Sequence, residues 1–315
     1  MTQDYIRQRL QQRSVILALS TFACLLWGSA FPFLKISYAM LELPAHDWGA
    51  KVLFAGYRFF LASLLLFMVT SFGLKQPLRI ARKRLPNFIG LGLVQTTFQY
   101  FFFYNGLAYS TGITGSIIGA TTSLFMVIIS RIYYKTDLLT SDKVLGLLVG
   151  FAGAMVVNLP ASSLDLGFSF VGEGFLLISS LMGALGSIMA KELSADNHPF
   201  LVTAYPMLFG SILLIGTGSI ASGFGSVIFG WKSLLMLLYL AFASATAFSI
   251  WYSILKYNQP GEVAVYRFLI PIWGTLLSAL FLKEPIGLST AAALLMVSVG
   301  IGLVNRKKVK SIPAS

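Results

Sequence analysis

Two arginines, Arg58 and Arg267, stand inside long apolar runs of this 315-residue chain. A cation in such a run costs roughly 2.5–3.5 kcal/mol on membrane insertion, so it usually faces protein or water. A guanidinium that lines a cavity can bind a carboxylate through two parallel hydrogen bonds. In the alternative interpretation, each arginine lies close enough to the end of its run for its long side chain to reach the head groups.

A second set of polar groups lies on one predicted helix over 86–108. Gln95 and Gln99 are four residues apart and therefore share a face, Tyr100 belongs to a neighbouring stripe with Tyr104, and Asn105 follows. An amide that faces lipid leaves its N–H unsatisfied, so this face is expected to point inward. It could hydrogen-bond a substrate, with aromatic rings stacking on the rest of that molecule, or simply join neighbouring helices.

Small residues and prolines mark places where a helix could bend. Gly28 and Ser29 precede Pro32 in the first apolar run, and Gly186 and Ser187 take a similar place in the sixth. The alternative to a hinge is close packing of small residues. The predicted hinge or gate residues are Gly28, Pro32, Gly186 and Pro271. The predicted substrate-binding residues are Trp27, Ser29, Arg58, Gln95, Gln99, Tyr100, Asn105, Ser187, Trp251, Tyr266 and Arg267.

Other chemistries find little support in the sequence. The chain has two histidines and one cysteine, too few for a Cys/His metal site, and no nucleotide-binding or metalloprotease motif. No catalytic residue, metal or cofactor is therefore expected. Asp137 and Glu284 stand at predicted helix ends and are interpreted as structural caps. No carboxylate lies mid-segment, which disfavours a deep proton relay.

The elements that would position these residues are membrane helices. Apolar residues make up 57% of the chain and charged residues 11%, where soluble domains carry about 25%. A spanning helix needs about 20 apolar residues, and continuous runs of this kind disfavour a β-barrel. Ten segments fit, and the fold is predicted to be all-α. Their approximate bounds are 14–36, 52–73, 86–108, 112–133, 143–160, 170–191, 199–219, 231–256, 261–282 and 287–305.

Charge predicts the orientation of these segments. With the N-terminus inside, seventeen Lys and Arg fall at inner ends and loops against four at outer ones. Cytoplasmic loops carry such an excess, so a multi-pass protein of the cell membrane with both termini cytoplasmic is expected. The net charge of +12 is attributed to lipid head groups, not to nucleic acid. The first segment resembles a signal peptide in its basic leader, but its length favours a retained helix.

The chain also repeats itself. A shift of 147 residues brings Val157-Asn158 onto Val304-Asn305 and Gly153 onto Gly300. Each half then holds five segments, and because five is odd, the second half enters the membrane from the opposite side. Inverted repeats of this kind are typical of secondary transporters. The predicted domains are residues 14–160 and 170–305, arranged around a central cavity.

Several short motifs stand in order along the ten segments: Leu26-Trp27-Gly28-Ser29-Ala30-Phe31, Arg58-Phe59, Phe268-Leu269-Ile270-Pro271, Leu282-Lys283-Glu284 and Gly300. In these motifs the chain resembles the EamA type of the drug/metabolite transporter superfamily. The family often has Gly where Lys283 stands, a departure that could alter the outer rim. The resemblance implies that segments 1–4 and 6–9 surround the cavity, and that amino acids, drugs or similar metabolites are exported.

The leading hypothesis is therefore a secondary exporter of amino acids or drug-like amphiphiles that works by alternating access. Its expected partners are a small-molecule substrate and the lipid bilayer, with the chain a monomer or homodimer. Uptake or exchange of carboxylated or phosphorylated metabolites remains open, as does a carrier for lipids or lipid-linked sugars. A non-transporting scaffold or sensor is a further alternative, although it has no physical need for an inverted repeat.

Overall fold

The computed structural model describes residues 3–134, 141–156 and 168–304. All regular elements in these ranges are helices. The first half contains α1 (Gln3–Gln11), α2 (Arg13–Met40), α3 (Trp48–Met68), α4 (Leu85–Leu91), α5 (Gln99–Ala108), α6 (Gly112–Gly119), α7 (Thr121–Tyr134) and α8 (Ser141–Val156). The second contains α9 (Phe175–Asp196), α10 (Pro199–Ser222), α11 (Trp231–Tyr257), α12 (Pro260–Val263), α13 (Leu269–Leu282) and α14 (Leu288–Val304).

Shorter turns extend or join several of these helices. Wider π-helical turns continue α3 over Val69–Gly73, connect α4 to α5 over Gly92–Phe98, and lead into α9 over Phe170–Gly174. A tighter 3₁₀ segment, Ala264–Phe268, connects α12 to α13, and two others lie in connections at Arg82–Arg84 and Phe224–Ser226. Pairs of labelled helices therefore act as single rods, which is why the predicted bounds follow the helices within a few residues.

Seven helical runs in the described part of the chain are long and apolar enough to cross a membrane. They are Arg13–Met40, Trp48–Gly73, Gly112–Tyr134, Phe170–Asp196, Pro199–Ser222, Trp231–Tyr257 and Pro260–Leu282. The other three predicted segments coincide with α4–α5, α8 and α14, which are interrupted or shorter. An all-helical membrane protein is thus established, and the number of ten crossings stays a prediction. Asp137 lies outside the described residues.

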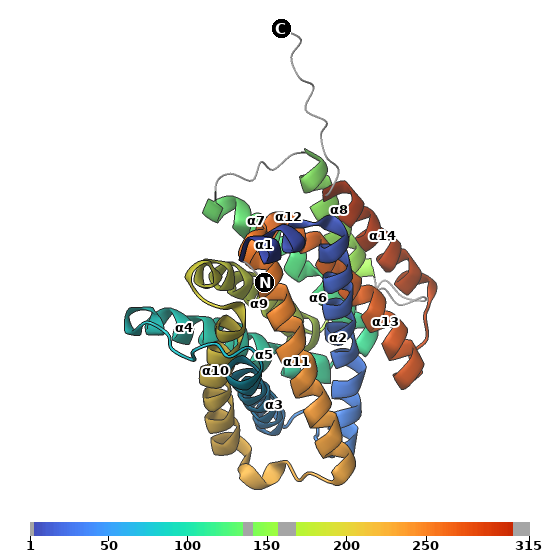
Figure 1. The fold of residues 1–315 in the computed structure, drawn as a ribbon. Helices are drawn as coiled ribbons and strands as arrows, with labels where there is room; N and C mark the ends of the chain where they lie inside the picture. The colour runs from blue at the N-terminus through green and yellow to red at the C-terminus, as the bar shows by residue number, and fades with distance from the viewer. Residues whose placement is uncertain (1–2, 135–140, 157–167, 305–315) are drawn as a thin grey trace.

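The helices sort into two bundles by their packing partners (Figure 1). The α2 bundle consists of α2 with α11 and α13, both of which pack along it. The α9 bundle consists of α9 with α5 and the α6–α7 rod. α3 packs on α10, and α8 packs on α14, forming two further pairs. Close helix approach requires small residues at the contacts, and a Cβ on Gly28 of α2 would lie 2.7 Å from the Cβ of Trp273 on α13.

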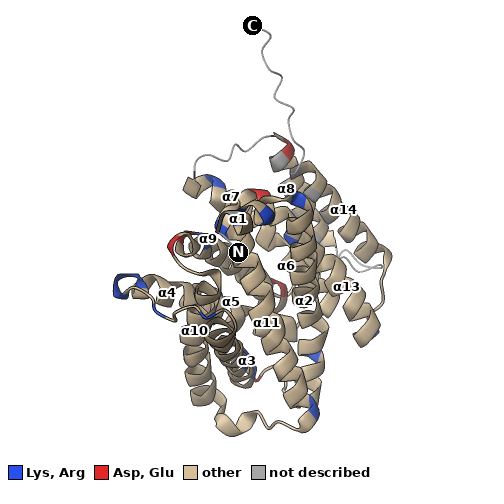
Figure 2. Cartoon of the chain, in the orientation of Figure 1, with Lys and Arg blue, Asp and Glu red and all other residues tan. Residues whose placement is uncertain are grey.

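Most charged residues lie around α1, at the end of α9 and in the connection before α4, and few lie at the opposite end of the molecule (Figure 2). One end holds α1, which is tied to the end of α11 because the side chain of Asn258 donates to the carbonyl of Leu10 at 2.9 Å. We call this the α1 end. The opposite end, here the far end, holds the connection between α2 and α3 and the connection between α10 and α11.

Capping interactions fix several helix starts at the far end. Asp47 accepts a hydrogen bond from the N–H of Ala50 at 2.9 Å and another from the hydroxyl of Ser222 at 2.6 Å, which ties α3 to α10. Burial raises the pKa of Asp47, but these two hydrogen bonds, together with the nearby Lys51 and His46, outweigh it and leave the pKa below its usual value. Glu284 accepts from the N–H groups of Gly112 and Ile113, both at 2.8 Å. Its carboxylate therefore caps α6, not the nearby α14.

Candidate functional site

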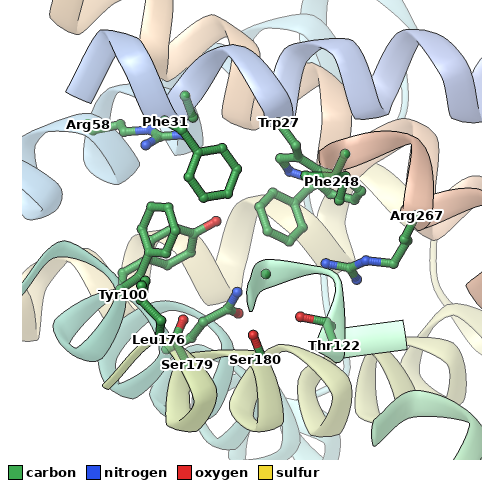
Figure 3. A pocket seen from close by; sticks show the side chains of 15 residues that line it. Trp27, Phe31, Arg58, Tyr100, Thr122, Leu176, Ser179, Ser180, Phe248 and Arg267 are labelled. Atoms are coloured by element: carbon green, nitrogen blue, oxygen red, sulfur yellow. The ribbon is translucent and has the colours of Figure 1, made fainter. Parts of the chain in front are cut away.

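A cavity lies between the α2 bundle and the α9 bundle (Figure 3). It encloses about 580 Å³, counting the part open to solvent. Its lining residues are Trp27, Ala30, Phe31, Arg58, Gln99, Tyr100, Phe103, Gly119, Thr122, Leu176, Ser179, Ser180, Phe248, Arg267 and Ile270.

Arg58 reaches the cavity from α3 and is only 1% exposed, so it does not extend to the membrane surface. Its Nε donates to the hydroxyl of Ser244 at 2.7 Å and to the carbonyl of Leu240 at 3.1 Å, both on α11. Its Nη1 donates to the hydroxyl of Tyr104 at 3.2 Å. All three partners are neutral. They fix the direction of the guanidinium but leave its charge uncompensated and its Nη2 free of hydrogen bonds to the described residues.

Arg267 enters from the 3₁₀ segment before α13 and is 6% exposed. The guanidinium carbon lies 4.8 Å from the ring centre of Trp27 and 5.3 Å from that of Trp251. Nη1 donates to the hydroxyl of Ser187 at 3.2 Å, whereas Nε is buried with no hydrogen-bond partner among the described residues. Cation–π contacts with two rings partly replace the lost water but provide no anion.

No carboxylate pairs with either arginine in the part of the chain that the structure describes. An ion pair in this part of the chain joins Arg84 to Asp196 at the α1 end, away from the cavity. Among the described residues, two buried guanidiniums thus face one cavity without a counter-charge. A buried charge without a partner is costly, so this arrangement favours an anionic occupant over a neutral or cationic one.

The remaining walls are aromatic on one side and hydroxyl-bearing on the other. The ring of Phe248 meets the ring of Trp27 edge to face, with centroids 5.1 Å apart. Thr122, Ser179 and Ser180 provide hydroxyl groups opposite these rings, as Figure 3 shows. The cavity could therefore hold an apolar or aromatic body while hydroxyls and guanidiniums bind its polar groups.

The structure brings some of the residues predicted from the sequence together at this cavity. Trp27, Arg58, Gln99, Tyr100 and Arg267 line it directly. Ser187 and Trp251 lie one contact away, because both hold Arg267 in place. The binding role of all seven stays a prediction, which the geometry allows.

Four other predicted residues lie elsewhere. Gln95 sits behind Gln99 and donates to its side-chain oxygen at 3.0 Å. Ser29 hydrogen-bonds the hydroxyl of Tyr239 at 2.7 Å, and the amide nitrogen of Asn105 donates to a carbonyl of its own helix. Tyr266 is not among the lining residues, and its carbonyl accepts from the thiol of Cys24.

The predicted hinge residues occupy different settings. Gly28 and Gly186 lie at close contacts between helices, where a Cβ would meet Trp273 or the side chain of Gln95. Pro32 lies within α2 and is buried, and Pro271 stands in the first turn of α13, where a proline is tolerated. A hinge role stays a prediction for all four.

Several lining residues escaped the sequence analysis. Phe31, Phe103 and Phe248 look like any other phenylalanine in a membrane helix, and no local signal separates an inward ring from an outward one. Ser179 and Ser180 form a polar pair inside the apolar run of α9, and that pair could have been recognised as an inward-facing step.

Comparisons with known proteins agree with this architecture. The model of the EamA-like transporter family matches residues 13–159 and again residues 170–306. An uncharacterized transporter of Bacillus subtilis, YvbV, is 28% identical over 92% of this chain and 91% of its own length. An uncharacterized transporter of Archaeoglobus fulgidus is 25% identical over 93% of this chain and 99% of its own.

A solved crystal structure covers 93% of this chain and 96% of its own at 19% identity, with a TM-score of 0.70, and shows that the fold occurs elsewhere. Together with the apolar helices, the family match identifies a multi-pass membrane transporter. The chain belongs to the EamA-like transporter family.

Proposed function

We propose that this chain is a secondary transporter that moves small carboxylate-bearing metabolites across the cell membrane by alternating access. The observation that carries the proposal is the pair of buried arginines, Arg58 and Arg267, which face one cavity with no carboxylate of the described residues beside them. Binding of an organic anion there replaces an unfavourable, uncompensated charge by a charge-assisted hydrogen bond.

Alternating access rests on the proposed inverted repeat of two five-crossing halves, 14–160 and 170–305. Packing supports it, because α2 lies against α11 and α13 in the same way as α9 lies against α5 and α7. Under the repeat, α2 corresponds to α9, α5 to α11, and α7 to α13. Each bundle then combines the first helix of one half with the third and fourth of the other. A cavity between two such bundles can open to either side when they rock.

A single carboxylate at each arginine suits the site better than a phosphate does. Arg58 and Arg267 stand at opposite ends of the cavity in Figure 3, so they do not converge on one anion. A phosphate monoester carries about −1.5 to −2 charges at pH 7, more than one guanidinium compensates, whereas a carboxylate carries one. The rings of Trp27 and Phe248 would pack against an apolar or aromatic body.

The charge of the cavity also sorts the other predicted substrates. Amino acids and acidic drug-like amphiphiles carry the required carboxylate, whereas cationic amphiphiles would add positive charge to two buried guanidiniums. Export and cytoplasmic termini remain part of the proposal. They rest on the family resemblance and on the Lys and Arg bias of the loops.

Transport in liposomes tests the proposal. Purified protein is reconstituted, and uptake of labelled aromatic carboxylates, amino acids, phosphate monoesters and cationic amphiphiles is measured with and without a pH gradient. Carboxylates should be carried, and Arg58→Gln should raise their KM at least about tenfold because one charge-assisted contact is lost. Arg267→Lys should do the same, since an ammonium cannot stack between two rings as a planar guanidinium does.

The matched control is Arg84→Gln, which removes a surface arginine of the α1 end and should leave KM unchanged. Preference for phosphate monoesters would move the assignment to the phosphorylated class. Preference for cations would refute the anion site. Wild-type protein that carries none of the panel would favour a scaffold or sensor. Light scattering of the purified protein, before it is reconstituted, separates the monomer from the homodimer.

A further inference from the structure

Two lysines at opposite ends of the molecule make the same kind of contact. Lys35, near the end of α2, donates from its Nζ to the carbonyl of Leu107 at 3.3 Å and closely to the carbonyl of Ser110. Lys191, near the end of α9, donates to the carbonyls of Leu255 and Asn258, both at 2.9 Å. Each ammonium thus caps the C-terminal end of a helix, where free carbonyls attract a cation.

The acceptors correspond to each other along the chain. Leu255 follows Leu107 by 148 residues, and Asn258 follows Ser110 by the same 148 residues. The donors stand at matching places, since α2 and α9 are the first crossings of the two halves. The same clamp is therefore built twice, once at the far end by Lys35 and once at the α1 end by Lys191.

Both clamps join one bundle to the other. Lys35 belongs to the α2 bundle and holds α5 of the α9 bundle, whereas Lys191 belongs to the α9 bundle and holds α11 of the α2 bundle. Because the cavity lies between these bundles, one clamp stands beyond each of its two ends. Both are formed in this structure.

A second polar contact strengthens each clamp. At the far end, Glu284 follows α13 of the α2 bundle and accepts from the N–H groups of Gly112 and Ile113 at the start of α6. At the α1 end, Lys256 on α11 donates to the carbonyl of Asn197, just after α9, at 3.0 Å. At both ends the two bundles are thus joined by charge-assisted hydrogen bonds to backbone groups, which break and reform without any change in protonation.

We propose that Lys35 and Lys191 are the two gate latches of the transport cycle: release of Lys35 opens the cavity at the far end, and release of Lys191 opens it at the α1 end. The proposal rests on the alternating-access function put forward above. Water competes with the backbone carbonyls for each lysine ammonium. A closed end is therefore favoured by only a few hydrogen bonds and can open during turnover.

Side-specific labelling of a cysteine in the cavity wall tests this assignment. The chain has a single cysteine, so Cys24→Ser removes the background, and Ser179→Cys places a thiol among the lining residues. A membrane-impermeant maleimide is then added outside sealed vesicles of either orientation, so that it reaches one face of the protein at a time. Exposed positions at the two ends, His46→Cys and Ala195→Cys, report which face is which, so no orientation is assumed.

Lys35→Met should speed labelling of the cavity cysteine about tenfold from the far-end face and leave the rate from the other face unchanged or lower. Lys191→Met should produce the mirror result. Lys51→Met is the matched control, because Lys51 on α3 also donates to three backbone carbonyls. These belong to Pro44, Ala45 and Asp47, in the connection that leads into α3, so they do not join the two bundles. It should speed labelling from neither face.

Equal acceleration from both faces in either variant would mean that the lysines only hold the fold together, and the proposal would be wrong. Unchanged labelling, or acceleration from the opposite face, would overturn it too. Lys35→Arg and Lys191→Arg keep the charge and the donors, so the cavity cysteine in these variants should be labelled nearly as slowly as in the chain with both lysines. The labelling needs no transported solute. A wild-type chain without transport in liposomes would therefore refute the proposed function and leave the sidedness result to stand or fall by itself.

Discussion

The hydroxyl of Tyr104 accepts a hydrogen bond from Nη1 of Arg58 at 3.2 Å, and both side chains are almost completely buried. The same tyrosine anchors α5 to α2, because its carbonyl accepts from the hydroxyl of Tyr38 at 3.0 Å. Tyr104 therefore couples the direction of the guanidinium to the packing of two helices that face the cavity.

Removal of that hydroxyl should weaken substrate binding while it destabilises the folded protein little. Tyr104→Phe keeps the ring and its packing but removes one of the three acceptors that orient Arg58, so KM for carboxylates should rise about three- to tenfold. Uptake in liposomes measures it. Tyr252→Phe is the control, because Tyr252 is equally buried but its hydroxyl has no hydrogen-bond partner among the described residues. Equal effects of the two substitutions would contradict an orienting role.

Gly28 should tolerate no larger side chain. A Cβ there would lie 2.7 Å from the Cβ of Trp273 and 2.8 Å from the backbone nitrogen of Gly274, so Gly28→Ala should separate α2 from α13 and cost about 1–3 kcal/mol. Thermal unfolding in detergent would show a lower Tm. Gly216→Ala on α10 meets no atom within 4 Å and should leave Tm unchanged or raise it slightly. A stable Gly28→Ala variant would show that this contact can yield.

Acid should loosen the junction of α3 with α10. The pKa of Asp47 is lowered in the folded chain, so its contribution to stability is complete at neutral pH and is lost as the pH falls through the folded-state pKa. Tm in detergent should therefore fall between about pH 5 and pH 3, and less steeply in Asp47→Asn. Identical pH profiles for the two proteins would exclude Asp47 as the cause.

The single cysteine should report unfolding. Cys24 is 0% exposed and its thiol contacts the carbonyl of Tyr266, so a fluorescent maleimide should react only when α2 leaves the segment before α13. The reaction should follow the thermal transition and should be delayed by a bound carboxylate, since ligand binding stabilises the native state. Rapid labelling at room temperature would show that this region opens locally in the folded protein.

The helices could be predicted from the sequence because they follow from local physics, whereas the sequence left the two arginines either inward or directed to the head groups, and only the structure shows that they are buried. Twenty apolar residues in succession need lipid, and a guanidinium among them needs protein or water, wherever the rest of the chain lies. Gln99 followed from the same reasoning, because an amide in an apolar helix must turn inward, and Tyr100 was predicted as its neighbour on that helix.

The tertiary structure decided which inward residues meet. Gln95 and Gln99 share a helix face, yet only Gln99 lines the cavity. Gln95 packs beside Gly186 of α9 and donates a hydrogen bond to the side-chain oxygen of Gln99. The π-helical turn over Gly92–Phe98 changes the helical period there, which no local pattern announced. Lys35 and Lys191 also stood out only when their distant carbonyl partners were known.

The sequence by itself therefore determined the class of protein, the apolar helices and the presence of two arginines within them, since each depends on residues close together in the chain. The tertiary structure alone decided the shape of the cavity, the partners of each arginine and the two lysine clamps. These depend on contacts between residues far apart in the chain, such as Arg58 with Ser244, 186 positions away, and such contacts arise from helix packing, which local composition does not encode.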